Sequence, residues 1–182
     1  FRDSEKELSK NEYTTLVKTA KDRGNIRLAL ILETIGATGI RVSEVKNITV
    51  EALLEGRAEI ALKGKIRIIL LPQKLCRKLL RYAKAQTITA GAVFRTRNDR
   101  PLTRQQIWAE MKGVCRAAGV APSKVFPHNL RHLFARVFYG IEKDIAKLAD
   151  ILGHSSIDTT RIYIISTGTE HRRRMETMHL IL

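Results

Sequence analysis

The chain has 182 residues, the length of one domain with a single sizeable hydrophobic core. Its hydrophobic fraction of 44% excludes a disordered chain, and its two cysteines exclude a disulfide scaffold. Lysine and arginine number 33 against 18 acidic residues, so the formal net charge of +15 favours a polyanionic partner.

Nucleic acid and an anionic membrane surface are the two polyanions to compare. No apolar run approaches the roughly 18 residues that span a bilayer, and the basic residues are spread along the chain. The sequence therefore favours nucleic acid. Cys76 and Cys115 lack a close cysteine partner, which fits a reduced, cytoplasmic protein. Because residues 1–10 are polar and carry no signal-peptide pattern, we expect a single domain over 1–182, a fragment lacking its upstream domain.

The first third of the chain predicts three helices. Ser9 and Glu12 have the spacing of a capping box that opens the first helix. Residues 26–35 are strongly apolar and predict a second helix, which Gly36 and Gly39 end. Ser43 has the side chain to cap a third, short helix.

The residues that follow predict a small sheet. The runs 48–53, 58–62 and 66–71 are short and rich in β-forming residues, and turn-forming residues separate them. Pro72 closes the last run. These runs predict a three-stranded antiparallel meander.

Helical spacing of apolar residues returns after Pro72. One helix carries Leu75, Leu79 and Leu80, and another extends from a Thr103 cap to about Gly119 through Ile107, Trp108, Met111 and Cys115. A third helix begins at Pro127, a fourth carries residues 145–152 and stops at Gly153, and a last helix lies within 171–182. The predicted fold class is mainly α with a small three-stranded antiparallel β-sheet.

The helix that begins at Pro127 is predicted to have two different faces. One stripe is apolar and consists of Leu130, Leu133, Phe134, Val137 and Phe138. His128, Arg131 and His132 project on the other side, where they can form a phosphate clamp. A solvated basic face explains the same three residues, and the spacing alone favours it.

A zinc site is a third interpretation of this helix, because His128 and His132 are four residues apart. Zinc hydrolases with this spacing carry a glutamate after the first histidine, and Asn129 stands there. Arg131 places a cation beside the metal, and no third ligand follows from the spacing. The sequence therefore predicts no metal site.

Two further segments carry polar residues in glycine-containing turns. Arg41 follows Gly39, and Glu44 is placed to hold the Arg41 side chain. Lys63 lies in a tight turn between two predicted strands. At the tip of such a hairpin, the lysine ammonium either extends into a groove of the ligand or is simply solvated.

A histidine and a tyrosine close the set of candidate residues. His154 follows Gly153 at a predicted helix junction, a usual place for an exposed functional side chain. Tyr163 lies nine residues later. A half-buried aromatic ring is the ordinary explanation for a single tyrosine.

These residues share one chemistry. The aspartates are scattered and form no close pair, so converging carboxylates of the kind that hold two metal ions are not expected. A tyrosine attacks a phosphodiester, arginines and histidines stabilise the pentacoordinate phosphate that this attack forms, and a lysine protonates the leaving oxygen. The set therefore predicts phosphoryl transfer that needs no metal and no cofactor.

In order and spacing the motifs resemble the catalytic domain of the tyrosine recombinases, also known as the phage integrase family. The resemblance spans nearly the whole chain. It is carried by Thr38-Gly39-Ile40-Arg41-Val42-Ser43-Glu44, the Lys63 hairpin, His128-Asn129-Leu130-Arg131-His132, and Leu152-Gly153-His154-Ser155-Ser156 with Tyr163. Each motif alone is weak, but four in the right order are specific.

The resemblance implies a role for each residue. Four basic side chains surround the scissile phosphate: Arg41, Arg131, His128 and His154. Tyr163 forms a 3′-phosphotyrosyl bond, Lys63 donates a proton to the leaving 5′ oxygen, and Glu44 orients Arg41. The implied function is site-specific recombination or integration of double-stranded DNA without metal or ATP. The implied assembly is a homotetramer on DNA, held through the segment 171–182.

The chain departs from the family pattern in places. The hairpin is short, so Lys65 is an alternative to Lys63 as the general acid. Asn129 stands where an acidic residue is frequent, and His132 is expected to be structural. Further contacts to DNA are expected from Lys65, Arg95, Arg97 and Arg104.

Two alternative functions remain open at the level of sequence. A type IB topoisomerase-like enzyme uses the same chemistry to relax DNA as a monomer. A non-catalytic DNA-binding module retains the fold and lacks the reaction.

Overall fold

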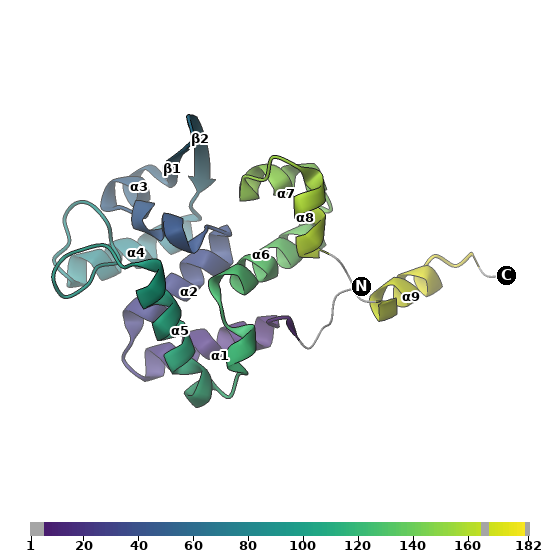
Figure 1. The fold of residues 1–182 in the computed structure, drawn as a ribbon, viewed down its shortest axis with the longest axis horizontal. Helices are drawn as coiled ribbons and strands as arrows, with labels where there is room; N and C mark the ends of the chain where they lie inside the picture. The colour runs from purple at the N-terminus through teal and green to yellow at the C-terminus, as the bar shows by residue number, and fades with distance from the viewer. Residues whose placement is uncertain (1–5, 165–167, 181–182) are drawn as a thin grey trace.

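The computed structural model describes residues 6–164 and 168–180, and these residues form a mainly helical fold with one small sheet (Figure 1). In chain order the elements are α1 (Lys10–Asp22), α2 (Ile26–Thr38), the 3-10 helix η2 (Val42–Asn47), α3 (Val50–Glu55), β1 (Arg57–Leu62), β2 (Lys65–Leu70), α4 (Gln73–Ala85), α5 (Arg104–Ala118), the 3-10 helix η3 (Pro122–Lys124), α6 (Pro127–Glu142), α7 (Ile145–Leu152), α8 (Ile157–Ile164) and α9 (Gly168–Thr177). The predicted mainly helical fold class is confirmed.

Helix α2 is the centre of the core. It is apolar nearly all round, and α1, α4, α5 and α6 pack against it (Figure 1). A helix with no polar face is stable only when other elements surround it. This central position brings the C-terminal end of α2, which Gly39 closes in the left-handed conformation, next to α6.

The predicted end of this helix at Gly36 is wrong, because α2 continues to Thr38. Gly36 lies inside the helix, where a Cβ atom would come within 2.8 Å of the Tyr13 ring of α1. The glycine at this position therefore permits close packing of α1 on α2. It does not stop the helix.

The sheet has two strands, not the predicted three. β1 and β2 pair as an antiparallel hairpin, with Arg57 opposite Leu70 and Leu62 opposite Lys65. Most of the predicted first strand, 48–53, is helical instead. The Thr49 side chain accepts a hydrogen bond from the Ala52 backbone at 3.0 Å, which begins α3. Gly56 ends α3 in the left-handed conformation.

Helices α6, α7 and α8 share a second, smaller core. Leu148 and Leu152 are buried there, with Phe134 and Phe138 packed against them. The helices predicted around Leu75–Leu80, from Thr103 to about Gly119, from Pro127 onward and over 145–152 are confirmed as α4, α5, α6 and α7. Their predicted apolar faces are less exact, since Trp108 and Val137 are exposed.

The C-terminal helix differs from its predicted bounds. α9 begins at Gly168 and ends at Thr177, so it starts before the predicted range 171–182 and ends within it. Figure 1 shows α9 apart from the other described helices. Across the described ranges, no helix combines the length and apolar character needed to cross a membrane.

Candidate active site

Five segments bring several predicted polar residues together with Arg67, which was not predicted. Gly39 ends α2 in the left-handed conformation, and the extended backbone of Arg41 then leads into η2. β2 contributes Arg67, α6 contributes Arg131, and the junction between α7 and α8 contributes His154. Residues that are more than a hundred positions apart in the chain therefore meet at one place.

The Glu44 carboxylate binds two of these arginines, Arg41 and Arg67. Its Oε1 atom accepts from the Arg41 guanidinium at 3.1 Å, and its Oε2 atom accepts from the Arg41 backbone N–H at 3.0 Å. The Arg67 guanidinium forms an ion pair with the same Oε2 atom. The expected pairing of Glu44 with Arg41 is confirmed. Ser43, predicted to cap this short helix, lies inside it, and Arg41 is the residue at its N-terminal cap.

Arg131 is buried, with 3% of its surface exposed. Its guanidinium donates to the carbonyl oxygen of Gly39, and to that of Leu152 at 3.0 Å. These carbonyls lie at the C-terminal ends of α2 and α7, where helix dipoles stabilise a cation. The solvated basic face favoured by the spacing is therefore wrong for Arg131 and for His132, which is also buried.

His154 lies at the helix junction as predicted. Gly153 is left-handed, the His154 backbone N–H donates to Ala149 at 2.9 Å, and Ser156 begins α8 by accepting from the Asp158 N–H at 3.2 Å. Arg131 reaches His154 Nε2 at 3.4 Å, and Thr160 Oγ1 lies 2.8 Å from Nδ1. We assign the ring proton to Nδ1, because an arginine nitrogen can only donate to Nε2.

The surroundings of His154 keep its ring uncharged at neutral pH. Burial is the largest effect, and the positive charges of Arg131, Arg41, Arg67 and His128 act in the same direction. Together they lower the pKa of His154 to about 4. A bound anion opposes the effect of the arginines, so the ring is sensitive to whether a phosphate occupies the site.

His128 and His132 lie one turn apart at the start of α6. Their ring centroids are 4.6 Å apart, and His128 is exposed while His132 is buried. The exposed His128 acts electrostatically on His154, which in turn contacts Arg131 of the arginine cluster (Arg41, Arg67 and Arg131). His132 is covered, in agreement with the structural role expected for it.

The two lysines of the hairpin lie at its tip. Lys63 and Gly64 both have positive φ, at 48° and 77°, as two-residue hairpin turns require. Lys65 begins β2 and is two residues from Arg67, so both belong to the same face of the strand. Lys63 and Lys65 are both exposed.

Tyr163 belongs to α8, but its side chain lies outside the described part of the structure. The other expected DNA contacts lie outside the arginine cluster. Arg104 and Arg97 are exposed. Arg95 uses its guanidinium within its own loop, donating to the Ala92 carbonyl at 2.6 Å and to the Ala90 carbonyl.

Arg67 and Thr160 are site residues that the sequence reasoning missed. Arg67 had a detectable signal, because it is two residues from the buried Ile69 and so lies on the covered face of β2. An arginine on such a face needs a buried partner. Thr160 gave no comparable signal, since its partner is set by the turn between α7 and α8.

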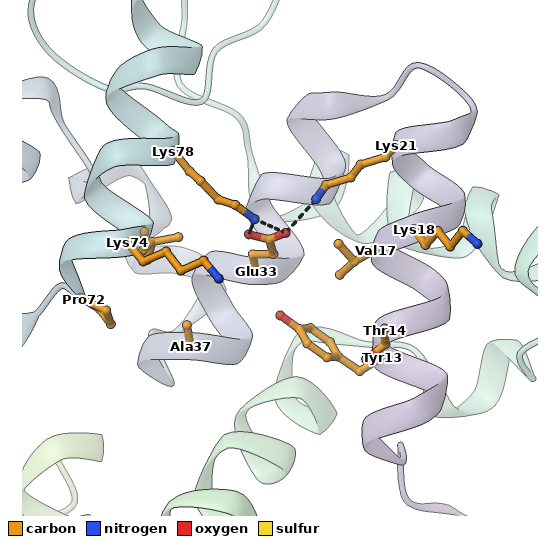
Figure 2. A pocket seen from close by; sticks show the side chains of 11 residues that line it. Tyr13, Thr14, Val17, Lys18, Lys21, Glu33, Ala37, Pro72, Lys74 and Lys78 are labelled. Carbon is orange, nitrogen blue, oxygen red and sulfur yellow. Dashed lines mark hydrogen bonds and ion pairs between the residues drawn. The ribbon is translucent and has the colours of Figure 1, made fainter.

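A separate cleft of about 520 Å³ opens between α1, α2 and α4 (Figure 2). Glu33 lies at its base and binds Lys21 at 3.2 Å and Lys78 at 2.8 Å. None of the arginines of the candidate site lines it. Burial, with a smaller effect of Glu33, raises the pKa of the Tyr13 hydroxyl in this cleft to about 12.

The arrangement is suited to binding an anion. The Glu44 carboxylate pairs with Arg41 and Arg67, and Arg131 adds a third guanidinium that is bound to backbone carbonyls, so positive charge is in excess. Within the described ranges, no three histidine, cysteine, aspartate or glutamate side chains converge on a metal-sized site. Charge-assisted hydrogen bonds from arginine are strongest with phosphate or carboxylate oxygens.

Comparison with known proteins gives one consistent match. The Phage integrase family matches residues 6–170. Tyrosine recombinase XerA of Pyrococcus furiosus is 32% identical over 184 residues, which cover 97% of this chain and 63% of the relative.

Solved structures agree in fold. A crystal structure of XerA recombinase superposes with a TM-score of 0.80 at 26% identity, covering 97% of this chain and 64% of that one. The Tn1549 transposon integrase in complex with transposon right end DNA gives a TM-score of 0.75 at 18% identity, over 100% of this chain and 68% of the other. The chain spans less than two thirds of the length of the XerA relative.

Proposed function

The chain belongs to the phage integrase family, and on that premise we propose that it is the catalytic domain of a tyrosine site-specific recombinase. The reaction cuts and rejoins double-stranded DNA without metal or ATP. The observation that carries the proposal is the convergence of Arg41, Arg131 and His154 at one place, from segments far apart in the chain.

Tyr163 is the proposed nucleophile. Its phenol oxygen forms a bond to phosphorus while the bond from phosphorus to the 5′ oxygen breaks, which leaves a 3′-phosphotyrosyl link and a 5′-hydroxyl. The phenol proton passes to a base in the site, and a lysine gives a proton to the leaving 5′ oxygen. The covalent bond conserves the energy of the broken phosphodiester, so the reverse attack by a 5′-hydroxyl rejoins the strand.

The basic residues are proposed to stabilise the pentacoordinate phosphate. Arg41 and Arg131 supply guanidinium donors, and both are held before the substrate arrives, by Glu44 and by helix-end carbonyls respectively. His128 and His154 are the other two groups proposed to contact this phosphate. The general acid is Lys63 or Lys65, and the position of Lys65 on the same face as Arg67 supports Lys65 as the alternative.

The proposed substrate is duplex DNA. The formal net charge of +15 and the DNA-bound integrase that shares the fold both support it. Arg97 and Arg104 are proposed to contact the phosphate backbone, Arg104 from the N-terminal end of α5. Arg95 joins them only if DNA displaces its contacts to backbone carbonyls. We also propose a cytoplasmic location, which a DNA substrate supports.

The active assembly is proposed to be a homotetramer on DNA, joined through the C-terminal segment 171–182. The separation of α9 from the other described helices supports this arrangement. Met175, Met178 and Leu180 are exposed along the segment, and contact with a neighbouring protomer would cover them.

The test is covalent trapping with the full-length protein. Supercoiled plasmid that carries the target site is incubated in EDTA and stopped with SDS, and the Tyr163→Phe variant is run beside it. We expect a protein–DNA adduct that requires Tyr163, because Phe lacks the attacking oxygen, while DNA affinity stays within about threefold.

Other outcomes would point to the alternative functions. An adduct accompanied by plasmid relaxation, with no strand exchange, would indicate a type IB topoisomerase-like enzyme. DNA binding that gives no adduct with either protein would indicate a non-catalytic binding module.

A further inference from the structure

We infer that Arg67 is a positioning residue that holds Arg41 and Arg131 in one fixed geometry for DNA cleavage. The inference rests on the proposed function, and it assigns a role to a residue of the Lys63 hairpin that the sequence analysis did not place among the site residues. Arg67 lies between the supports of the two arginines proposed to bind the scissile phosphate, and it contacts both supports.

The first support is the Glu44 carboxylate. Glu44 is almost fully covered, with 8% of its side chain exposed, and it pairs with Arg41 through Oε1 and with Arg67 through Oε2. The Arg67 side chain is covered as well, at 15% exposed, whereas that of Arg41 is 34% exposed. The Arg41 guanidinium is therefore the more exposed of the two, and Arg67 binds the second oxygen, Oε2, of the shared carboxylate.

The second support is the Leu152 carbonyl at the end of α7. Arg67 donates to this oxygen at 2.6 Å, and Arg131 donates to it at 3.0 Å. Arg67 also lies 3.4 Å from the Ile151 carbonyl. The same acceptor thus fixes one guanidinium from the hairpin and one from α6.

The next residue, Gly153, shows how closely Arg67 fits this turn. A Cβ atom on Gly153 would lie against Cδ of Arg67 and 2.9 Å from its Nη1 atom. His154 follows at once, so the side chain of Arg67 packs on the turn that presents the histidine. A shift of Arg67 would move the turn and both arginine supports together.

Arginine suits this position for a reason that lysine does not share. The Nη1 and Nη2 atoms serve two different acceptors, Leu152 and Glu44. A lysine ammonium is a single point of charge on a flexible stem, so it cannot hold both acceptors in a fixed relation. The Arg67→Lys variant is therefore expected to keep the charge balance and only part of the geometry.

The experiment compares Arg67→Gln and Arg67→Lys with the unsubstituted full-length protein. Two quantities are measured: the rate of covalent adduct formation at saturating DNA, and the dissociation constant for the same DNA. We expect Arg67→Gln to slow adduct formation by about 100-fold, the cost of a misplacement of roughly 1 Å at a reacting centre. DNA affinity should change by less than about threefold, and Arg67→Lys should recover part of the rate.

Arg136 provides the matched control. It is an arginine of similar exposure, 21%, that pairs with Glu7 at 3.7 Å and donates to the Leu8 carbonyl at 2.7 Å, away from the candidate site. Arg136→Gln should lower thermal stability as Arg67→Gln does, and leave the rate of adduct formation within about twofold. A general loss of stability is thereby separated from a loss of positioning.

A double-mutant cycle with Glu44→Gln adds a second measurement. Because Arg67 acts on Arg41 through Glu44, the combined loss in rate should be clearly smaller than the product of the two separate losses. If Arg67→Gln does not fold, the comparison of Arg67→Lys with Arg136→Lys replaces it.

The outcomes separate the two proposals. Equal rates for the Arg67 and Arg136 variants, or independent effects of Arg67 and Glu44, would overturn the positioning role while the unsubstituted protein still forms its adduct. No adduct from the unsubstituted protein would instead overturn the proposed function.

Discussion

His154 shows how the site uses burial and charge on a single residue. Its pKa is lowered to about 4 from an ordinary value of 6.5, first by burial and then by Arg131, Arg41, Arg67 and His128. The folded state therefore binds a proton at His154 less readily than the unfolded state does. A group of this kind makes its full contribution to stability above about pH 6.5, and the contribution is lost as the pH falls toward about 4.

The prediction concerns the pH dependence of unfolding. Urea midpoints of the unsubstituted protein should fall more steeply between pH 7 and pH 4.5 than those of His154→Gln, because glutamine cannot take up the proton that destabilises the folded state. The carboxylates titrate alike in both proteins, so the difference between the two curves isolates the histidine. Parallel curves would mean that the surroundings of His154 do not lower its pKa.

Close packing of α1 on α2 gives a prediction at the scale of elements. A Cβ atom on Gly36 would meet the Tyr13 ring at 2.8 Å, whereas a Cβ atom on Gly113 in α5 would meet nothing within 4 Å. Gly36→Ala should therefore destabilise the protein by about 1–3 kcal/mol through overpacking. Gly113→Ala should stabilise it by about 0.5–1 kcal/mol, because alanine loses less conformational entropy in a helix.

The measurement is the denaturant midpoint of unfolding for each variant. The slope of the unfolding free energy against denaturant concentration should stay unchanged. Gly36→Ala in a Tyr13→Ala background is the internal control, since the ring that the new methyl group meets is then gone. A penalty that persists in this background would show that packing against Tyr13 is not the reason for glycine at position 36.

Local signals in the sequence predicted most helices, and the errors have a local cause as well. The run 48–53 contains β-branched residues, yet Thr49 caps a helix whose Val50 and Leu53 are buried three residues apart. A single turn of helix and a short strand are hard to separate by periodicity over so few residues. The strand prediction failed there because the cap at Thr49 and the left-handed Gly56 act together.

Contacts in the site were predictable where the two residues are near each other in the chain, and unpredictable where the two residues are far apart. The Arg41–Glu44 pair follows from a spacing of three residues. The Arg67–Glu44 pair spans 23 residues, and the contact of Arg67 with Leu152 spans 85, so only the fold shows them. Burial of Arg131 was missed for the same reason, because its acceptors are carbonyls of two other helices.

At the scale of the whole molecule, the cleft and the candidate site are in different places. The cleft between α1, α2 and α4 is lined partly by lysines, while the arginine cluster lies where α2, β2, α6 and α7 meet. The proposed substrate, duplex DNA, is wide and stiff, so a phosphate in it must be bound at an accessible surface instead of in a deep cavity. The exposed His128 and the partly exposed Arg41 fit that requirement.

The separated helix α9 gives the last prediction, which concerns assembly on DNA. The apolar side chains Met175 and Met178 are 65% and 58% exposed, and Arg172 and Arg173 are exposed in the same segment. Replacing both methionines with glutamate, or both arginines with glutamine, lowers the net charge by two in either case.

The two double variants should therefore weaken binding of one protomer to DNA about equally, since the affinity of a single protomer for DNA depends on its charge. Only the glutamate variant should lose the higher-order DNA complexes and strand exchange, because the proposed contact buries apolar surface. Sedimentation of the DNA complexes at matched salt measures both effects, and equal loss of assembly in the two variants would show that α9 acts through its charge alone.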